Sequence, residues 1–208
     1  PYSQILINSR PIISALSGVD GLEQIPVNMI ERVEVVRGGG SALFGANAVG
    51  GTINIITKDP VSNSFQVSSM MSNMNGKSWE QYMGGNVSLV AKDNSYGIAL
   101  YETYRNRNPY DADGDGFSEL GKLNMNTFGM RAYYRPSYNS RINIEYHTTN
   151  EFRRGGNKFD LQPHETDITE QTKHIINSGG LSYDHYWNEA KHKMSLYGSI
   201  QHTDRNSY

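Results

Sequence analysis

Residues 127–147 read TFGMRAYYRPSYNSRINIEYH and decide the fold class of this chain. Apolar and polar side chains alternate along residues 127–134 and again along residues 141–147, on either side of a polar turn at residues 136–140. Successive side chains of a β-strand point to opposite faces of a sheet. The stretch therefore predicts an antiparallel hairpin with one apolar face and one face that carries charge in mid-strand.

The same period of two residues recurs from residue 64 onward, for example in residues 86–91 and 194–201. Tight polar turns are predicted at residues 92–95, 136–140 and 188–191, and longer links at residues 75–79, 106–122 and 153–172. Tight turns that alternate with long loops are typical of outer-membrane barrels, and about seven strands result, too few and of the wrong parity to close a barrel. A soluble β-sandwich also alternates, so it stays open as a second interpretation.

The composition is compatible with strands that cross a membrane. Hydrophobic residues make up 37% of the chain, and the mean hydropathy is −0.61. No apolar run reaches the roughly 18 residues of a spanning helix, whereas a transmembrane strand needs only about 9–11 residues with alternate ones facing lipid. The 14 tyrosines favour an outer-membrane strand set, and the absence of cysteine excludes disulfides. A net charge of −2 gives no indication of a nucleic-acid partner.

Residues 1–59 follow a different pattern. A helical turn that begins near a proline is predicted at residues 25–30, and short strands are predicted at residues 32–37 and 52–57. Glycine-rich loops separate these elements. We therefore expect a small α+β domain at residues 1–59 and antiparallel strands at residues 60–208, so that the whole chain is mainly β.

Three segments of the first domain carry a specific resemblance. They are IPVNMIERVEVVRG at residues 25–38, SALFG at residues 41–45 and GGTINIITK at residues 50–58. Together they closely resemble the plug-domain signature of TonB-dependent outer-membrane receptors. The usual family pattern has proline after Arg-Gly. Here Gly39 and Gly40 follow instead, a variant similar to receptors from Bacteroides-type bacteria.

The resemblance implies a fold, a function and partners. Residues 1–59 would be the C-terminal part of the plug, and residues 60–208 the first strands of a large transmembrane β-barrel that is not closed in this chain. The function implied is import across the bacterial outer membrane of a corrinoid such as vitamin B12, haem or a ferric siderophore, with uptake of oligosaccharides or other polymers as an alternative. TonB would supply energy through a segment expected upstream of Pro1. Membrane lipid, lipopolysaccharide and a surface lipoprotein are the other expected partners.

The resemblance also implies roles for individual plug residues. Plug arginines in this family pair with barrel glutamates and hold the plug in place, which makes Arg32, Glu34 and Arg37 candidates for such a plug–barrel lock. A solvated strand face is the alternative for Glu34. Phe44 and Asn47, in the plug loop, are candidates that face the substrate.

An acidic loop is the main candidate metal site. Residues 111–116 read DADGDG, which matches the first half of a calcium-binding loop, with carboxylates at alternate positions and glycine at the sixth. The candidate ligands are Asp111, Asp113, Asp115 and Glu119. The twelfth position is Lys122 instead of a bidentate glutamate, so another loop would have to complete the site. An exposed acidic loop without a cation is the alternative.

A second long loop is basic and aromatic. Arg153, Arg154 and Lys158 are candidates to contact an anionic ligand or lipopolysaccharide phosphates. The alternative is a structural loop anchored by Phe152 and Phe159.

No enzymatic site can be assembled from the sequence. His164 and His174 lie at no convincing metal-binding spacing, although loop histidines are able to ligate haem iron. The glycines at positions 45 and 50 have the spacing of a nucleotide-binding loop, but Gly51-Thr52 stands where Lys-Ser/Thr is required. We therefore expect no enzyme activity and no organic cofactor.

Overall fold

The computed structural model describes residues 3–11, 27–38, 48 and 50–208 of the chain. The chain divides into two compact units, Pro1–Asp59 and Pro60–Tyr208, each of which is described on its own.

The first unit contains a small mixed sheet. Its strands are β1 (Ser3–Ile7), β2 (Arg10–Pro11), β3 (Ile30–Arg37) and β4 (Gly51–Thr57), in the spatial order β2-β1-β4-β3, and a 3-10 turn, η1 (Val27–Met29), precedes β3. β4 is parallel to β1 and antiparallel to β3. Leu6 and Ile55 are buried within this unit. The helical turn and the two strands predicted from the sequence are all present.

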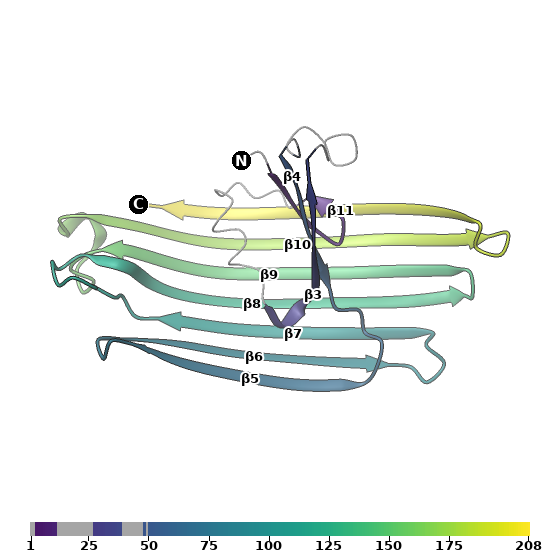
Figure 1. Cartoon of the computed structure of the whole chain (residues 1–208), viewed down its shortest axis with the longest axis horizontal. Helices are drawn as coiled ribbons and strands as arrows, with labels where there is room; N and C mark the ends of the chain where they lie inside the picture. The colour runs from purple at the N-terminus through teal and green to yellow at the C-terminus, as the bar shows by residue number, and fades with distance from the viewer. Residues whose placement is uncertain (1–2, 12–26, 39–47, 49) are drawn as a thin grey trace. The chain divides into compact units, whose positions relative to one another are not determined.

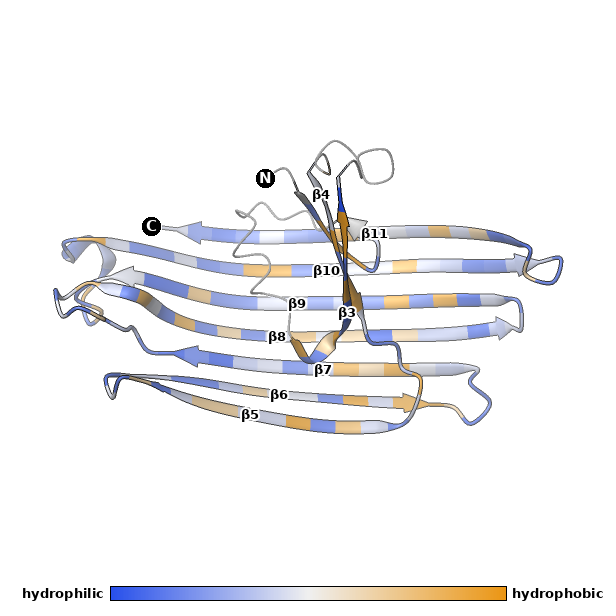
Figure 2. Cartoon of the chain, in the orientation of Figure 1, coloured by the Kyte–Doolittle hydropathy of each residue, from blue (hydrophilic) through white to orange (hydrophobic). Residues whose placement is uncertain are grey.

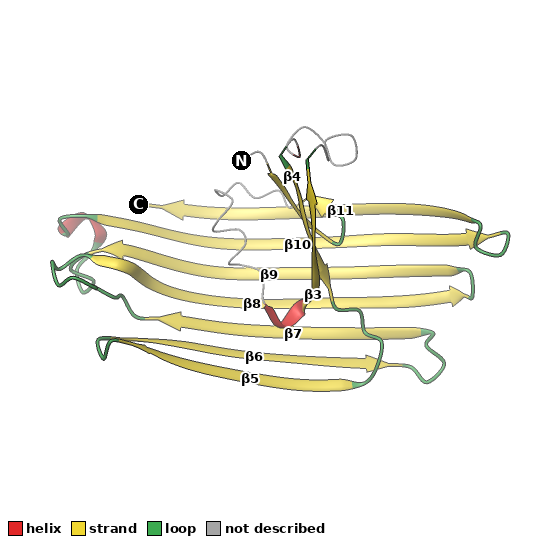
Figure 3. Ribbon diagram, in the orientation of Figure 1, coloured by secondary structure: helices red, strands yellow, loops and turns green. Residues whose placement is uncertain are grey.

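The second unit is a single antiparallel sheet of seven strands (Figures 1 and 3). The strands are β5 (Ser64–Met74), β6 (Ser78–Val90), β7 (Tyr96–Arg107), β8 (Ser118–Ser137), β9 (Ser140–Gly156), β10 (Thr169–Trp187) and β11 (His192–Ser207). Each strand is hydrogen-bonded to its neighbours in the sequence, and β5 and β11 form the two edges. The sheet is therefore open, and the predicted fold class, mainly β with an unclosed barrel, is confirmed.

The connections differ between the two ends of the sheet. Tight turns at residues 91–95, 138–139 and 188–191 lie at one end, and the links at residues 75–77, 108–117 and 157–168 lie at the other (Figure 1). The longest link contains a short 3-10 turn, η3 (Pro163–Glu165).

The first link at the second end was expected to be long, and this expectation was wrong. β5 and β6 are joined by three residues, Asn75–Lys77. Asn75 and Gly76 take positive φ values of 54° and 73°, and Lys77 N donates to Met74 O at 3.0 Å. Asn-Gly is the preferred pair for a two-residue hairpin turn because both central residues need a positive φ.

The two faces of the sheet have opposite character, as the alternating colours along the strands in Figure 2 show. One row of residues directly opposite each other across all strands is almost entirely apolar: Phe65, Val87, Leu100, Met130, Tyr146, Gly179 and Ile200. The adjacent row points to the other face and is polar: Gln66, Asn86, Tyr101, Gly129, His147, Ser178 and Gln201. Phe65 and Ile200 are each 77% exposed. Among the described residues, no helix has the length and apolar character needed to span a bilayer.

Candidate functional site

The polar face of the seven-stranded sheet is lined with hydroxyl, amide and paired charged groups. Arg105 Nε on β7 binds Glu80 Oε1 on β6 at 2.5 Å, and both side chains are mostly buried. Arg153 pairs with the fully buried Glu151 on β9. A face that holds compensated charges is unsuited to lipid and suits the interior of a barrel, whereas the apolar face suits lipid.

The acidic loop lies between β7 and β8, and the structure brings its four predicted carboxylates together. One ligand oxygen from each of Asp111, Asp113, Asp115 and Glu119 lies within 4.8 Å of all the others. Calcium binds oxygen at about 2.3–2.6 Å, so oxygens on opposite sides of one ion are roughly 5 Å apart. The spacing therefore fits a single calcium ion.

Backbone amides shape this loop. Asp111 Oδ1 accepts from Gly114 N at 2.5 Å and Asp111 Oδ2 accepts from Gly116 N at 2.9 Å, and these two bonds hold the pKa of Asp111 below its usual range. Glu119 Oε2 accepts from Ala112 N at 2.5 Å. Gly114 and Gly116 have positive φ values of 86° and 92°, which explains the need for glycine at both positions.

The basic residues of the β9–β10 loop do not share one surface. Arg153 belongs to the polar face of β9 through its pair with Glu151. Arg154 points to the opposite face, is 8% exposed, and donates to Leu161 O at 2.8 Å and to Lys158 O and Phe159 O at 3.4 Å. Lys158 Nζ binds Asp167 Oδ1 at 2.9 Å. A role of these residues in contacting a ligand or lipopolysaccharide stays a prediction.

Asp167, the partner of Lys158, accepts a second hydrogen bond within the same loop. Asp167 Oδ2 accepts from Asn157 Nδ2 at 2.7 Å. The hydrogen bonds from Lys158 and Asn157 lower the pKa of Asp167. This loop is therefore held together by its own polar groups, and Phe159 lies under the Arg154 guanidinium at 5.6 Å.

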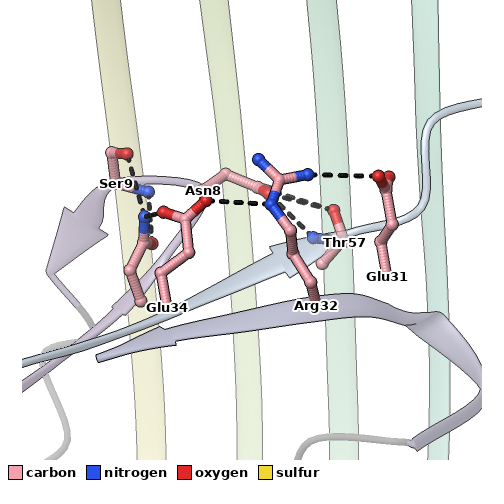
Figure 4. A network of polar contacts seen from close by, with 7 residues as sticks. Asn8, Ser9, Glu31, Arg32, Glu34 and Thr57 are labelled. Carbon is pink, nitrogen blue, oxygen red and sulfur yellow. Dashed lines mark hydrogen bonds and ion pairs between the residues drawn. The ribbon is translucent and has the colours of Figure 1, made fainter.

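In the first unit, the predicted lock residues Arg32 and Glu34 bind each other. Arg32 Nε donates to Glu34 Oε1 at 2.9 Å and Arg32 Nη1 to Glu31 Oε1 at 3.1 Å (Figure 4). Glu34 Oε2 accepts from Asn54 Nδ2 at 3.2 Å, and Asn54 Oδ1 accepts from Ser9 N at 2.9 Å. This polar cluster joins β3 and β4 to the turn after β1.

The remaining predicted site residues are more scattered. Arg37 ends β3 with an exposed side chain, and its pairing with a barrel glutamate stays a prediction. Phe44 and Asn47 lie outside the described residues. His164 is exposed in η3, and His174 is buried in β10.

Sequence reasoning missed the side chains that cross between strands on the polar face. Tyr101 on β7 is hydrogen-bonded to His147 on β9, and His147 is hydrogen-bonded in turn to Thr149 of the same strand. Alternation places these residues on one face, but pairing between strands is needed to show that they meet.

Comparison with known proteins gives the following relations. Residues 1–52 match the family described as TonB-dependent Receptor Plug Domain. The chain is 32% identical over 122 residues to the vitamin B12 transporter BtuB of Photobacterium profundum, which covers 54% of this chain and 19% of that protein. It is 43% identical over 65 residues to BtuB of Vibrio vulnificus, covering 31% of this chain and 11% of that protein.

Solved structures share the fold of the whole chain. The siderophore receptor PirA of Acinetobacter baumannii matches with a TM-score of 0.75 and 19% identity, over 97% of this chain and 32% of PirA. The unliganded ferric citrate transporter FecA matches with a TM-score of 0.72 and 18% identity, over 100% of this chain and 32% of FecA. The chain thus spans about a fifth of the first curated relative (19%) and about a third of these structures (32%).

Proposed function

We infer that this chain, which belongs to the TonB-dependent receptors, is the plug-to-barrel part of a bacterial outer-membrane importer of a scarce, large nutrient. One observation carries the proposal: a segment with the plug signature is followed by an open sheet whose two faces are separately apolar and polar. The apolar face would contact membrane lipid, and the polar face would line the interior of the barrel. Energy for release of the nutrient would come from TonB.

A corrinoid such as vitamin B12 is our first choice of substrate. It is supported by the two matched relatives, which are named vitamin B12 transporters. The structures of siderophore and citrate receptors support only the shared fold, because their identity to this chain is below 20%. Haem, a ferric siderophore and an oligosaccharide remain the alternative substrates.

A growth experiment with the full-length gene tests this choice. Deletion of the gene is expected to abolish growth when cobalamin is limiting and to leave growth on limiting haem or siderophore unchanged. Re-expression of the full-length gene provides the control. Normal growth of the deletion strain on limiting cobalamin would exclude the corrinoid proposal, and a defect on haem or siderophore would replace it with that nutrient.

We further propose that Asp111, Asp113, Asp115 and Glu119 hold a calcium ion that orders the outer loop. The proposal is supported by the mutual distance of at most 4.8 Å between the ligand oxygens. These four side chains would supply carboxylate oxygens, and further oxygens would come from the backbone, water or another loop. The ion would compensate the charge of four neighbouring carboxylates.

Calcium titration of the purified full-length receptor tests this proposal. Wild-type receptor is expected to bind calcium with a Kd of about 0.1–1 mM, the range typical of extracellular modules. The Asp113→Asn/Asp115→Asn double variant is expected to lose this binding. Asp93→Asn, in a turn at the opposite end of the sheet, is the matched control for loss of an exposed carboxylate. Equal binding by all three proteins would remove the site from this loop.

A further inference from the structure

In the polar row, one side chain extends across the neighbouring strand to reach the strand beyond it. Tyr101 on β7, Gly129 on β8 and His147 on β9 lie directly opposite one another. Tyr101 Oη is 3.1 Å from His147 Nδ1, and the two ring centroids are 6.3 Å apart. Neighbouring strands are about 4.8 Å apart, so β7 and β9 are separated by roughly 10 Å. The Tyr101 side chain therefore crosses over β8 to reach His147.

Gly129 is the residue that makes this crossing possible. A Cβ atom at position 129 would overlap Cζ, Oη and Cε1 of Tyr101. The φ of Gly129 is not in the left-handed region, so the backbone itself does not require glycine there. Glycine is needed because the tyrosine ring occupies the place of the missing side chain.

Further hydrogen bonds lead from His147 to β8, the strand that the Tyr101 side chain crosses. His147 Nε2 is 3.1 Å from Thr149 Oγ1, and Thr149 Oγ1 is 3.3 Å from Thr127 Oγ1 on β8. Thr127 and Thr149 are fully buried. A neutral imidazole accepts at one nitrogen and donates at the other, so Tyr101 can donate to Nδ1 while Nε2–H donates to Thr149. One chain of hydrogen bonds thus joins three strands.

A second tyrosine repeats the arrangement in the opposite direction. Tyr133 on β8 lies opposite Gly97 on β7, and a Cβ at Gly97 would approach Tyr133 Cε1 to 2.6 Å. The Tyr133 ring is 6% exposed and lies beneath the guanidinium carbons of Arg135 and Arg141, at 5.2 Å and 4.5 Å from its centroid. Strands β7 and β8 therefore each place one tyrosine over a glycine of the other.

We propose that Tyr101, Gly129 and His147 form a clasp that holds β7, β8 and β9 as one rigid section of the barrel wall. The clasp fixes the relative register of the three strands. A shift of β7 by one residue pair separates the Tyr101 ring from Gly129, and a shift of β9 separates His147 from the tyrosine hydroxyl. It also keeps a large aromatic ring flat against the polar face instead of projecting into the interior. The wall section then moves as one body. This role does not depend on which nutrient is transported.

Five variants of the full-length receptor in detergent test the clasp by their unfolding rates, followed as the loss of the compact band on unheated gels. Gly129→Ala is expected to unfold roughly tenfold faster or more, since overpacking displaces the ring. Gly198→Ala, in mid-strand β11 with no atom within 4 Å of its Cβ position, is the matched control and is expected to change the rate less than about twofold. Tyr101→Phe retains the ring, loses one hydrogen bond and is expected to unfold about fivefold faster.

The double variant Tyr101→Ala/Gly129→Ala separates the clasp from a general sensitivity of β8. It is expected to unfold no faster than Tyr101→Ala alone, because the added methyl group then meets no ring. Amide hydrogen exchange should show that the effect is confined to β7, β8 and β9. In Tyr101→Phe, exchange should be faster in residues 96–156 and unchanged in residues 192–207. The proposal is wrong if Gly129→Ala and Gly198→Ala unfold at the same rate. It is also wrong if Gly129→Ala still accelerates unfolding in the Tyr101→Ala background.

Discussion

At the scale of single residues, Arg154 shows how a buried charge is accommodated without a carboxylate. Its guanidinium donates to three backbone carbonyls of the loop that follows β9, those of Lys158, Phe159 and Leu161. Carbonyl oxygens lack net charge, but several of them together can satisfy the planar set of donors that arginine offers. The residue therefore acts as an internal support for this loop.

Replacement of Arg154 by alanine should loosen the β9–β10 loop. Three carbonyl groups would lose their donor, at a cost on the order of 2–3 kcal/mol for hydrogen bonds to a charged group. We expect residues 157–168 to become the first site of limited proteolysis in the folded receptor. Lys158→Ala removes an exposed ion pair of the same loop and should change cleavage little. Equal protease resistance of wild type and Arg154→Ala would contradict this role.

Asp111 should make the order of the acidic loop depend on pH in the absence of calcium. The amides of Gly114 and Gly116 lower its pKa, so they stabilise the charged carboxylate. Their contribution is present above the usual aspartate pKa of about 3.9 and is lost as the pH falls through the lower value of the folded loop. The chain has no cysteine, so a spin label on Ala112→Cys can report loop mobility, which should rise below about pH 4. Asp111→Asn should be mobile at every pH, and a pH-independent wild-type loop would contradict the prediction.

At the scale of elements, most strands could be predicted from the sequence, whereas their ends and contacts could not. The period of two residues in 127–147 gives both strands and the turn between them, because burial of one face imposes that period. The short turn at Asn75-Gly76 was missed, although its Asn-Gly pair is a direct hairpin signal.

The candidate site was predictable to a similar extent. The acidic cluster followed from local spacing, because all four residues lie within nine consecutive positions, 111–119. The Tyr101–His147 contact joins residues 46 positions apart and depends on the register of β7, β8 and β9. A single sequence does not show which residues of these strands lie opposite one another. The hydrogen bonds of Arg154 were missed for a different reason: its partners are backbone carbonyls of the following loop, which have no sequence signature.

A new charge should destabilise the receptor more at one residue of β11 than at its neighbour on the other face. Ile200→Arg places a charge on the apolar face, where lipid exposure near the membrane mid-plane costs about 2–4 kcal/mol. Ser199→Arg places the same charge on the polar face and should cost less than about 1 kcal/mol. Both residues are exposed in the described sheet, so folding of the full-length receptor into lipid vesicles, measured by urea titration, compares the two faces directly. Equal destabilisation by the two substitutions would contradict the assignment of Ile200 to a lipid-facing side and Ser199 to the opposite side.

At the scale of the whole molecule, the open sheet determines how the isolated chain should behave. Its apolar face exposes many large side chains, and the edges β5 and β11 offer unpaired backbone groups. Both features promote association in water. The separation of faces thus explains how a chain with a mean hydropathy of −0.61 can still present a continuous apolar surface.

The polypeptide of residues 1–208 should therefore stay in solution only with an amphiphile. After dilution from urea we expect it to sediment from plain buffer and to remain dispersed in detergent micelles, because micelles cover the apolar rows. A soluble control domain of similar size should be indifferent to detergent. A monodisperse monomer in plain buffer would support the soluble sandwich instead.

The neighbour-by-neighbour order of the seven strands also bears on how the wall is assembled. Each strand pairs with the strand that precedes it in the chain, so each new pairing closes only a short loop and costs little chain entropy. A sheet with such local pairing can grow by one hairpin at a time, without waiting for distant segments to meet. Each new hairpin then adds to the edge that the preceding hairpin leaves exposed, so the wall can be extended in the order in which the chain runs.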